Sequence, residues 1–221
     1  MGQADMLVSI AQCFDNDNAR IKKQRIKKTE ESWVLESAEF ARCTTGDEVL
    51  ATADDIVSRI NHILALYCNF EATLGVEYID WIDAQGKPFR THRDSVSVNI
   101  VSSKGQAELK KKSGTQPLGS AIFEARKRDS DVKEALSLHG DGDLSWGQVY
   151  DLIEFLGGVE GIARAGYAKS RGQTRAVRQT ANHHRHLGNA KNYPLPLTSP
   201  TLAQASEFAR SLLKRWIAAR V

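Results

Sequence analysis

TGDEVLATADDIVSRINHILALY, at residues 45–67, contains the clearest helical pattern in the chain. Its apolar side chains recur at steps of three and four residues, so they form one stripe along a helix. Thr45 and Glu48 stand before that stripe at the spacing of a capping box, which closes the first turn of a helix. We therefore predict a helix that begins at Thr45 and buries its stripe in a core. The central members of the stripe are Val57, Ile60 and Leu64.

The pattern changes after this helix, because from residue 74 the apolar residues alternate with a period of two. Such alternation is typical of a β-strand with one buried face. The sequence DAQG at residues 83–86 is typical of a turn, and residues 96–100 repeat the alternation on the return. We predict an antiparallel hairpin over residues 74–101.

From residue 129 the apolar residues recur at helical steps, and Ser145 and Gln148 form a second capping box. Ile153, Leu213 and Trp216 are central on these apolar stripes, so we expect them to be buried. The predicted helices are 131–138, 145–156, 159–167, 170–187 and 200–219. The predicted class is α+β, an N-terminal helix with a small antiparallel sheet followed by a C-terminal helical bundle.

Three regions follow from these patterns. Residues 1–44 form an N-terminal arm with a basic run and a short strand, residues 45–130 an α+β region, and residues 131–221 a basic helical region. The run RIKKQRIKK at Arg20–Lys28 has too few apolar residues for a buried face. We predict a solvated arm there, with an electrostatic contact to nucleic acid as the alternative. Ser32–Phe40 is predicted to be extended.

Composition excludes several classes of protein. No apolar run approaches the roughly 18 residues that a membrane span needs. Met6–Ala11 lacks the preceding basic segment of a signal peptide. Cys13, Cys43 and Cys68 have no metal-ligand spacing. We expect a cytoplasmic protein with free thiols, no membrane segment, and neither a metal nor a cofactor.

The charge of the chain is divided unevenly. Residues 162–221 contain eleven Lys and Arg and one acid, Glu207, whereas residues 1–161 contain nineteen bases and twenty-six acids. Such a division indicates a basic end that faces a polyanion. The alternative is a contact between the acidic body and the basic tail.

The basic end contains SRGQTRAVRQTANHHRHL at Ser170–Leu187, which we predict to be a helix with Gly188 at its C′ position. At 100° per residue one stripe is basic and faces outward, with His186 at its rim. The stripe contains Arg171, Arg175, Arg178, Asn182 and Arg185. The opposite, inward side contains Val177, Thr180, His184 and Leu187. Guanidinium groups match the geometry of phosphate, so a phosphate-bearing ligand is expected, with Lys191 as a further contact.

The histidines of this segment suggest acid–base chemistry. His186 lies beside Arg and Asn on the outer face, where an imidazole suits proton transfer at a phosphodiester. His183 and His186 are one turn apart and could instead share a metal, but no carboxylate or cysteine lies near them in sequence. Asp141 and Asp143, farther back, are interpreted as part of a turn before the Ser145 cap.

An arginine followed by histidine four to six residues later, on the penultimate helix of a bundle, resembles the HEPN superfamily of bacterial defence and toxin ribonucleases. Here the match is Arg178 with His183 or His184, followed by a closing helix at Pro200–Ala219, and it covers about residues 145–221. The resemblance implies a metal-independent endoribonuclease, a homodimer through the 170–187 helix, and a possible antitoxin or defence-system partner.

In this hypothesis His186 or His183 takes a proton from a 2′-hydroxyl, Arg178 stabilises the charge on the phosphate, and Asn182 orients the scissile group. The products would be a 2′,3′-cyclic phosphate and a 5′-hydroxyl. One alternative is a module that binds RNA or DNA without catalysis through the same arginines. Another is an interaction protein whose basic tail binds an acidic surface. The residues leave open which of these is correct.

Overall fold

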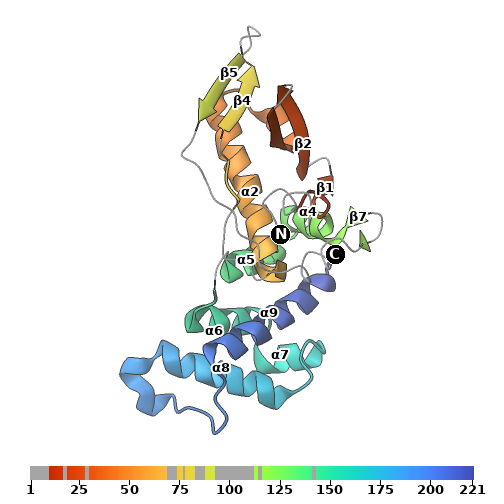
Figure 1. Cartoon of the computed structure of the whole chain (residues 1–221). Coiled ribbons are helices and arrows are strands. Elements are labelled where there is room, and N and C mark those ends of the chain that lie inside the picture. Colours follow the sequence, from red (N-terminus) through yellow and green to blue (C-terminus); the bar gives the residue numbers. More distant parts are fainter. Residues whose placement is uncertain are drawn as a thin grey trace. The chain divides into compact units, whose positions relative to one another are not determined.

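The computed structural model describes residues 10–16, 19–27, 30–68, 74–76, 78–82, 88–92, 112–113, 116–140 and 143–221. The chain forms two compact units, Met1–Lys127 and Arg128–Val221. The first contains small antiparallel sheets and helices, and the described residues of the second form only helices and loops (Figure 1). The predicted α+β class is confirmed.

The basic run of the N-terminal region lies in a sheet. The strands, in sheet order, are β1 (Asp15–Asn16), β2 (Ala19–Lys27) and β3 (Glu30–Glu36). β2 contains most of the run that we predicted to be a solvated arm. β3 supplies acids opposite its bases, because Arg20 pairs in register with Glu36 and Lys22 forms an ion pair with Glu36. Opposite charges across a strand pair favour the sheet, and the run considered alone does not reveal them.

A 3-10 helix, η1 (Ala38–Arg42), leads into α2 (Gly46–Cys68). The capping box of α2 is confirmed, since the Glu48 amide donates to Thr45 Oγ1 (3.2 Å) and the Thr45 amide donates to Glu48 Oε2 (3.3 Å). Ile60 and Leu64 are fully buried, as predicted. Val57 is only half-buried, because it lies at the edge of the stripe rather than at its centre.

The predicted hairpin is present, with its second strand earlier than expected. β4 (Tyr78–Ile82) pairs antiparallel with β5 (Pro88–His92). We had placed the return strand at residues 96–100, which lie outside the described residues. A further short pair, β6 (Lys112–Ser113) and β7 (Gln116–Pro117), precedes a helix that the sequence patterns did not reveal, α4 (Leu118–Arg128).

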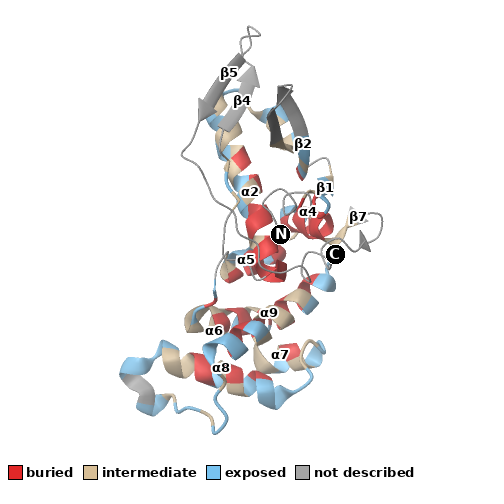
Figure 2. Cartoon of the chain, viewed as in Figure 1, coloured by how far each residue is buried: buried red, intermediate tan, exposed pale blue. Residues whose placement is uncertain are grey.

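α4 begins in close contact with the N-terminal segment. A Cβ atom at Gly119 would lie 2.6 Å from the carbonyl oxygen of Cys13, so only glycine allows this approach. Next to it, Ser120 Oγ accepts a hydrogen bond from the Asp15 amide (3.0 Å). α2 and α4 both contain buried residues (Figure 2). Phe123 of α4 is fully buried in the core.

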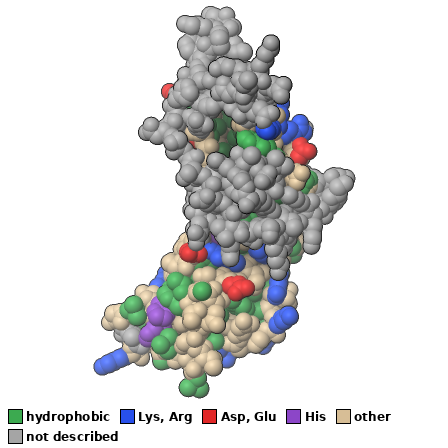
Figure 3. Space-filling model, in the orientation of Figure 1, with side chains coloured by type: hydrophobic (Ala, Val, Ile, Leu, Met, Phe, Trp, Pro, Cys, Tyr) green, Lys and Arg blue, Asp and Glu red, His purple; other side chains and the backbone are tan. Residues whose placement is uncertain are grey.

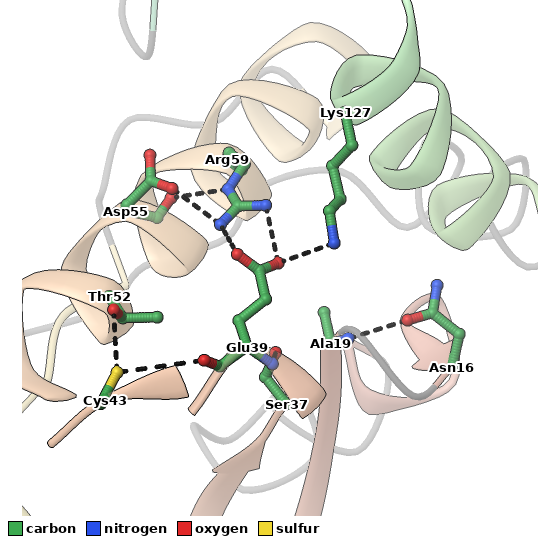
Figure 4. A network of polar contacts seen from close by, with 9 residues as sticks. All are labelled: Asn16, Ala19, Ser37, Glu39, Cys43, Thr52, Asp55, Arg59 and Lys127. Carbon is green, nitrogen blue, oxygen red and sulfur yellow. Dashed lines mark hydrogen bonds and ion pairs between the residues drawn. The ribbon is translucent and has the colours of Figure 1, made fainter. Parts of the chain in front are cut away.

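Glu39 joins η1, α2 and α4 through its carboxylate (Figure 4). It accepts from Arg59 Nη1 and Nη2 (3.0 and 2.8 Å) and pairs with Lys127 (3.1 Å), and Arg59 also pairs with Asp55 (2.7 Å). Burial acts to raise the pKa of the Glu39 carboxyl, but hydrogen bonds from Arg59 and Lys127 outweigh it and hold the pKa below its usual value.

The second unit is a helical bundle. Its helices are α5 (Ser130–His139), α6 (Trp146–Phe155), α7 (Gly158–Arg164), α8 (Arg171–Arg185), η2 (Leu187–Asn192) and α9 (Leu202–Ala218). The Ser145–Gln148 capping box is confirmed, and Ile153, Leu213 and Trp216 are buried as predicted. α9 begins later than expected, because Thr201 is its N-cap.

Candidate functional site

α8 is shorter than we predicted. Ser170 is its N-cap, as expected, but the helix ends at Arg185 and His186 is its C-cap. Gly188 is therefore not at a C′ position; it lies in η2, and Leu187, expected on the inward side, is 63% exposed. Val177 and Thr180 are buried, as expected for that side.

Three arginines of the predicted basic stripe form ion pairs with acids of α6 and α7. The pairs are Arg171–Glu160 (3.5 Å), Arg178–Glu154 (2.5 Å) and Arg185–Asp151 (3.0 Å). The residue numbers of the acids decrease as those of the arginines increase, which is the order that antiparallel helices produce. The prediction of an open basic face was wrong for these three residues, and part of the charge asymmetry is compensated within the unit.

Tyr150 of α6 lies under two of these arginines. Arg178 donates from Nη2 to the Tyr150 hydroxyl (3.3 Å), and the guanidinium carbons of Arg178 and Arg185 lie 5.3 and 4.8 Å from the ring centroid. The hydrogen bond to Glu154 raises the pKa of Arg178, although partial burial acts to lower it. Arg178 is thus a fixed cation whose side chain is 35% exposed.

A group of rings surrounds the C-terminal end of α8, and we call it the ring cluster. Its members are Trp146, His183, His184, His186 and Tyr193. His184 stacks on Trp146, with centroids 4.5 Å apart and planes at 9°, and His186 stacks on Tyr193 at 4.5 Å and 20°. His183 meets His184 edge-on at 5.4 Å. Each ring is half-buried or exposed, and Figure 3 shows histidine side chains at the surface next to hydrophobic ones.

The tautomer of His183 is fixed by its surroundings. His183 Nδ1 lies 2.6 Å from the carbonyl oxygen of Tyr193. A carbonyl oxygen only accepts, so Nδ1 carries the hydrogen and Nε2 of the neutral ring keeps a lone pair. An imidazole in this state can accept a proton at Nε2.

Different neighbours hold the residues that we predicted to act together. Arg178 lies on the α6 side of α8, whereas His183 and His186 approach Tyr193 beyond its end. Asn182 is half-buried between them in sequence, and its carbonyl oxygen accepts from the His186 amide (3.2 Å). Arg175 and Lys191 are exposed, and no carboxylate of the described residues pairs with either. The pattern of apolar residues in the sequence did not identify Trp146 or Tyr193 as residues of the candidate site.

A groove of about 690 Å³ lies on another side of α8, between α8 and α9. Its lining contains Val177, Pro200 and Phe208, and Glu207 is its only charged residue. A groove without a cation does not suit a polyanion, so we do not assign the predicted ligand to it.

Other candidate groups have ordinary roles. His139 is fully buried, with Nδ1 2.9 Å from the Gly140 carbonyl oxygen and Nε2 accepting from Arg210 (3.2 Å). Among the residues that the structure describes, no group of three His, Cys, Asp or Glu is placed to hold a metal ion. Within the same residues no helix has both the length and the apolar composition for crossing a membrane.

A comparison with protein-family models, curated proteins and solved structures finds no match to the chain. A function therefore has to be inferred from the side chains that α6, α8 and the segment after α8 bring together.

Proposed function

We propose that the second unit binds single-stranded RNA on the ring cluster. The observation that carries this proposal is the pair of stacks, Trp146 on His184 and Tyr193 on His186, at a partly exposed surface. Unpaired bases stack on aromatic and histidine rings, and such stacking contributes about 1–3 kcal/mol per base. Rings that the fold already holds in place lose little conformational entropy on binding.

Two cations beside α8 that pair with no carboxylate of the described residues supply the phosphate contacts in this proposal. Arg175 is on the exposed side of the helix, and Lys191 follows its end in η2. Arg171, Arg178 and Arg185, our other predicted contacts, would have to exchange a carboxylate for a phosphate before they could contribute. Recognition therefore depends on stacking more than on the number of basic residues.

The proposal is tested by fluorescence anisotropy with a short labelled single-stranded RNA and with the same strand in a duplex. Bases in a duplex are not available for stacking, so we expect much tighter binding of the single strand. Equal affinities would favour a purely electrostatic contact, and no binding of either would refute the proposal.

A second candidate is the HEPN-like, metal-independent endoribonuclease, and the hydrogen bond of His183 favours it. In this candidate Nε2 of His183 takes the proton of a 2′-hydroxyl. The 2′-oxygen then bonds to phosphorus, and the 5′-oxygen leaves and takes up a proton. Arg178 would release Glu154 to stabilise the phosphate. A homodimer through α8, an antitoxin or defence-system partner and a cytoplasmic location remain parts of this proposal.

A further inference from the structure

Arg126 of α4 is a buried cation in the first unit. Its residue surface is 7% exposed. Its Nε and Nη1 atoms are buried and have no hydrogen-bond partner among the described residues. A guanidinium is always protonated in proteins, so both nitrogens are donors without an acceptor. An unpaired buried charge is strongly unfavourable unless something compensates it.

The charged side chains that act electrostatically on Arg126 do not compensate its charge. Asp55 attracts it electrostatically but is engaged with Arg59, and Arg59 itself repels Arg126. The Glu39 carboxylate is taken by Arg59 and Lys127 (Figure 4). These five side chains hold three positive and two negative charges. One positive charge remains in this set, and within the described part of the chain the Nε and Nη1 donors of Arg126 have no acceptor.

We propose that Arg126 is the centre of a binding site for an oxyanion. A single negative charge would neutralise the cluster, and oxygen acceptors would satisfy the two donors. A carboxylate group and a phosphate group share this chemistry. The Asp55 side chain, which belongs to this cluster, is 64% exposed to solvent. This site lies in the first unit and is independent of the ring cluster.

The test uses the full chain and its melting temperature in chloride, acetate and inorganic phosphate at constant ionic strength. An anion that binds only the folded state should raise the melting temperature by roughly 2–4 °C at about five times its dissociation constant. Arg126→Met should abolish this shift and melt in chloride at or above the wild-type temperature, because the unpaired charge is gone. Arg42→Met, at an exposed arginine, should keep the shift.

The two anions identify the source, since a shift in acetate alone indicates a carboxylate ligand and a shift in phosphate alone a phosphoryl group. An equal shift in wild type and Arg126→Met would overturn the proposal. If Arg126→Met does not fold, NMR of the arginine Nε–H groups of the wild-type chain decides. We expect one Nε–H signal to move saturably with added anion, and unchanged signals would mean that the chain itself supplies the acceptor.

Discussion

Tyr150 illustrates that arginines of α8 make contacts within the fold. Arg178 and Arg185 both lie over its ring, and each also pairs with an acid of α6. A cation–π contact contributes about 0.5–1 kcal/mol at an exposed site, and a partly exposed ion pair contributes a similar amount or less. In the proposed complex, Arg175 and Lys191, which pair with no carboxylate of the described residues, are the cations that contact RNA phosphate.

His183 is the residue at which catalysis can be tested separately from binding. If the chain cleaves RNA, His183→Ala should lower the rate by about 10²–10⁴-fold, because it removes the group that accepts the 2′-hydroxyl proton. His186→Ala, which removes a stacking ring, should weaken binding and leave the rate at saturating RNA nearly unchanged. The measurement is cleavage of labelled RNA in the presence of a chelator. Equal rates for His183→Ala and wild type would remove the catalytic candidate.

Glu39 makes the stability of the chain sensitive to acid. Its pKa in the folded state lies below the usual value of about 4.3, so its contribution is present above that pH and is lost as the pH falls through the folded pKa. The urea midpoint of wild type should therefore exceed that of Glu39→Gln at neutral pH, and the difference should shrink below about pH 4. A difference that stays constant down to pH 3 would contradict the role assigned to this carboxylate.

At the scale of elements, α6 and α8 form the scaffold of the candidate site. Glu154 holds Arg178 in place, so Glu154→Gln should release a cation towards solvent. We expect RNA affinity to rise and the dependence on salt to steepen by about 0.7 in log–log slope, the value for one additional phosphate contact. The cost in stability should stay below about 1 kcal/mol, since both side chains are partly exposed.

Glu160→Gln is the matched control, because Arg171 is already 65% exposed and its pair is longer. It should change RNA affinity less than Glu154→Gln does. If Glu154→Gln weakens RNA binding, Arg178 supports binding through its position against Tyr150 and does not become an additional phosphate contact when it is released from Glu154.

The helices could be predicted from sequence because caps and apolar periods are local. Thr45 with Glu48 and Ser145 with Gln148 each identified a true helix start. α4 was missed, since it has no such cap and its burial depends on contact with the N-terminal segment around Cys13. Local patterns cannot report a partner that is distant in sequence.

The candidate site was predictable in part for the same reason. The composition of α8 identified the segment. The helical stripe at 100° per residue could not show that Asp151 and Glu154 would face its arginines. The constant step of seven residues between Arg171, Arg178 and Arg185, which places them along one side of the helix, was available as a signal. Tyr193 lies beyond the helix, where no periodicity applies, and only the fold places it against His183 and His186.

For the whole molecule, the charge asymmetry is smaller than the sequence suggests. The second unit contains thirteen Lys and Arg against nine Asp and Glu, because its boundary includes the acids of α5, α6 and α7. With Arg175 and Lys191 as the phosphate contacts, log affinity for single-stranded RNA should fall with log salt at a slope of about −1.4. Titrations across a series of salt concentrations measure it, and a slope several times steeper would mean that the paired arginines also bind phosphate.

The central claim is that RNA stacks on the ring cluster, and one titration tests it most directly. The affinity of the full chain for a single-stranded RNA should be compared between wild type, Tyr193→Leu and Tyr167→Leu, the last being a half-buried tyrosine outside the cluster. Loss of one stacking ring should weaken binding by roughly 5- to 150-fold in Tyr193→Leu, with Tyr167→Leu close to wild type. Equal affinities in all three proteins would contradict the claim.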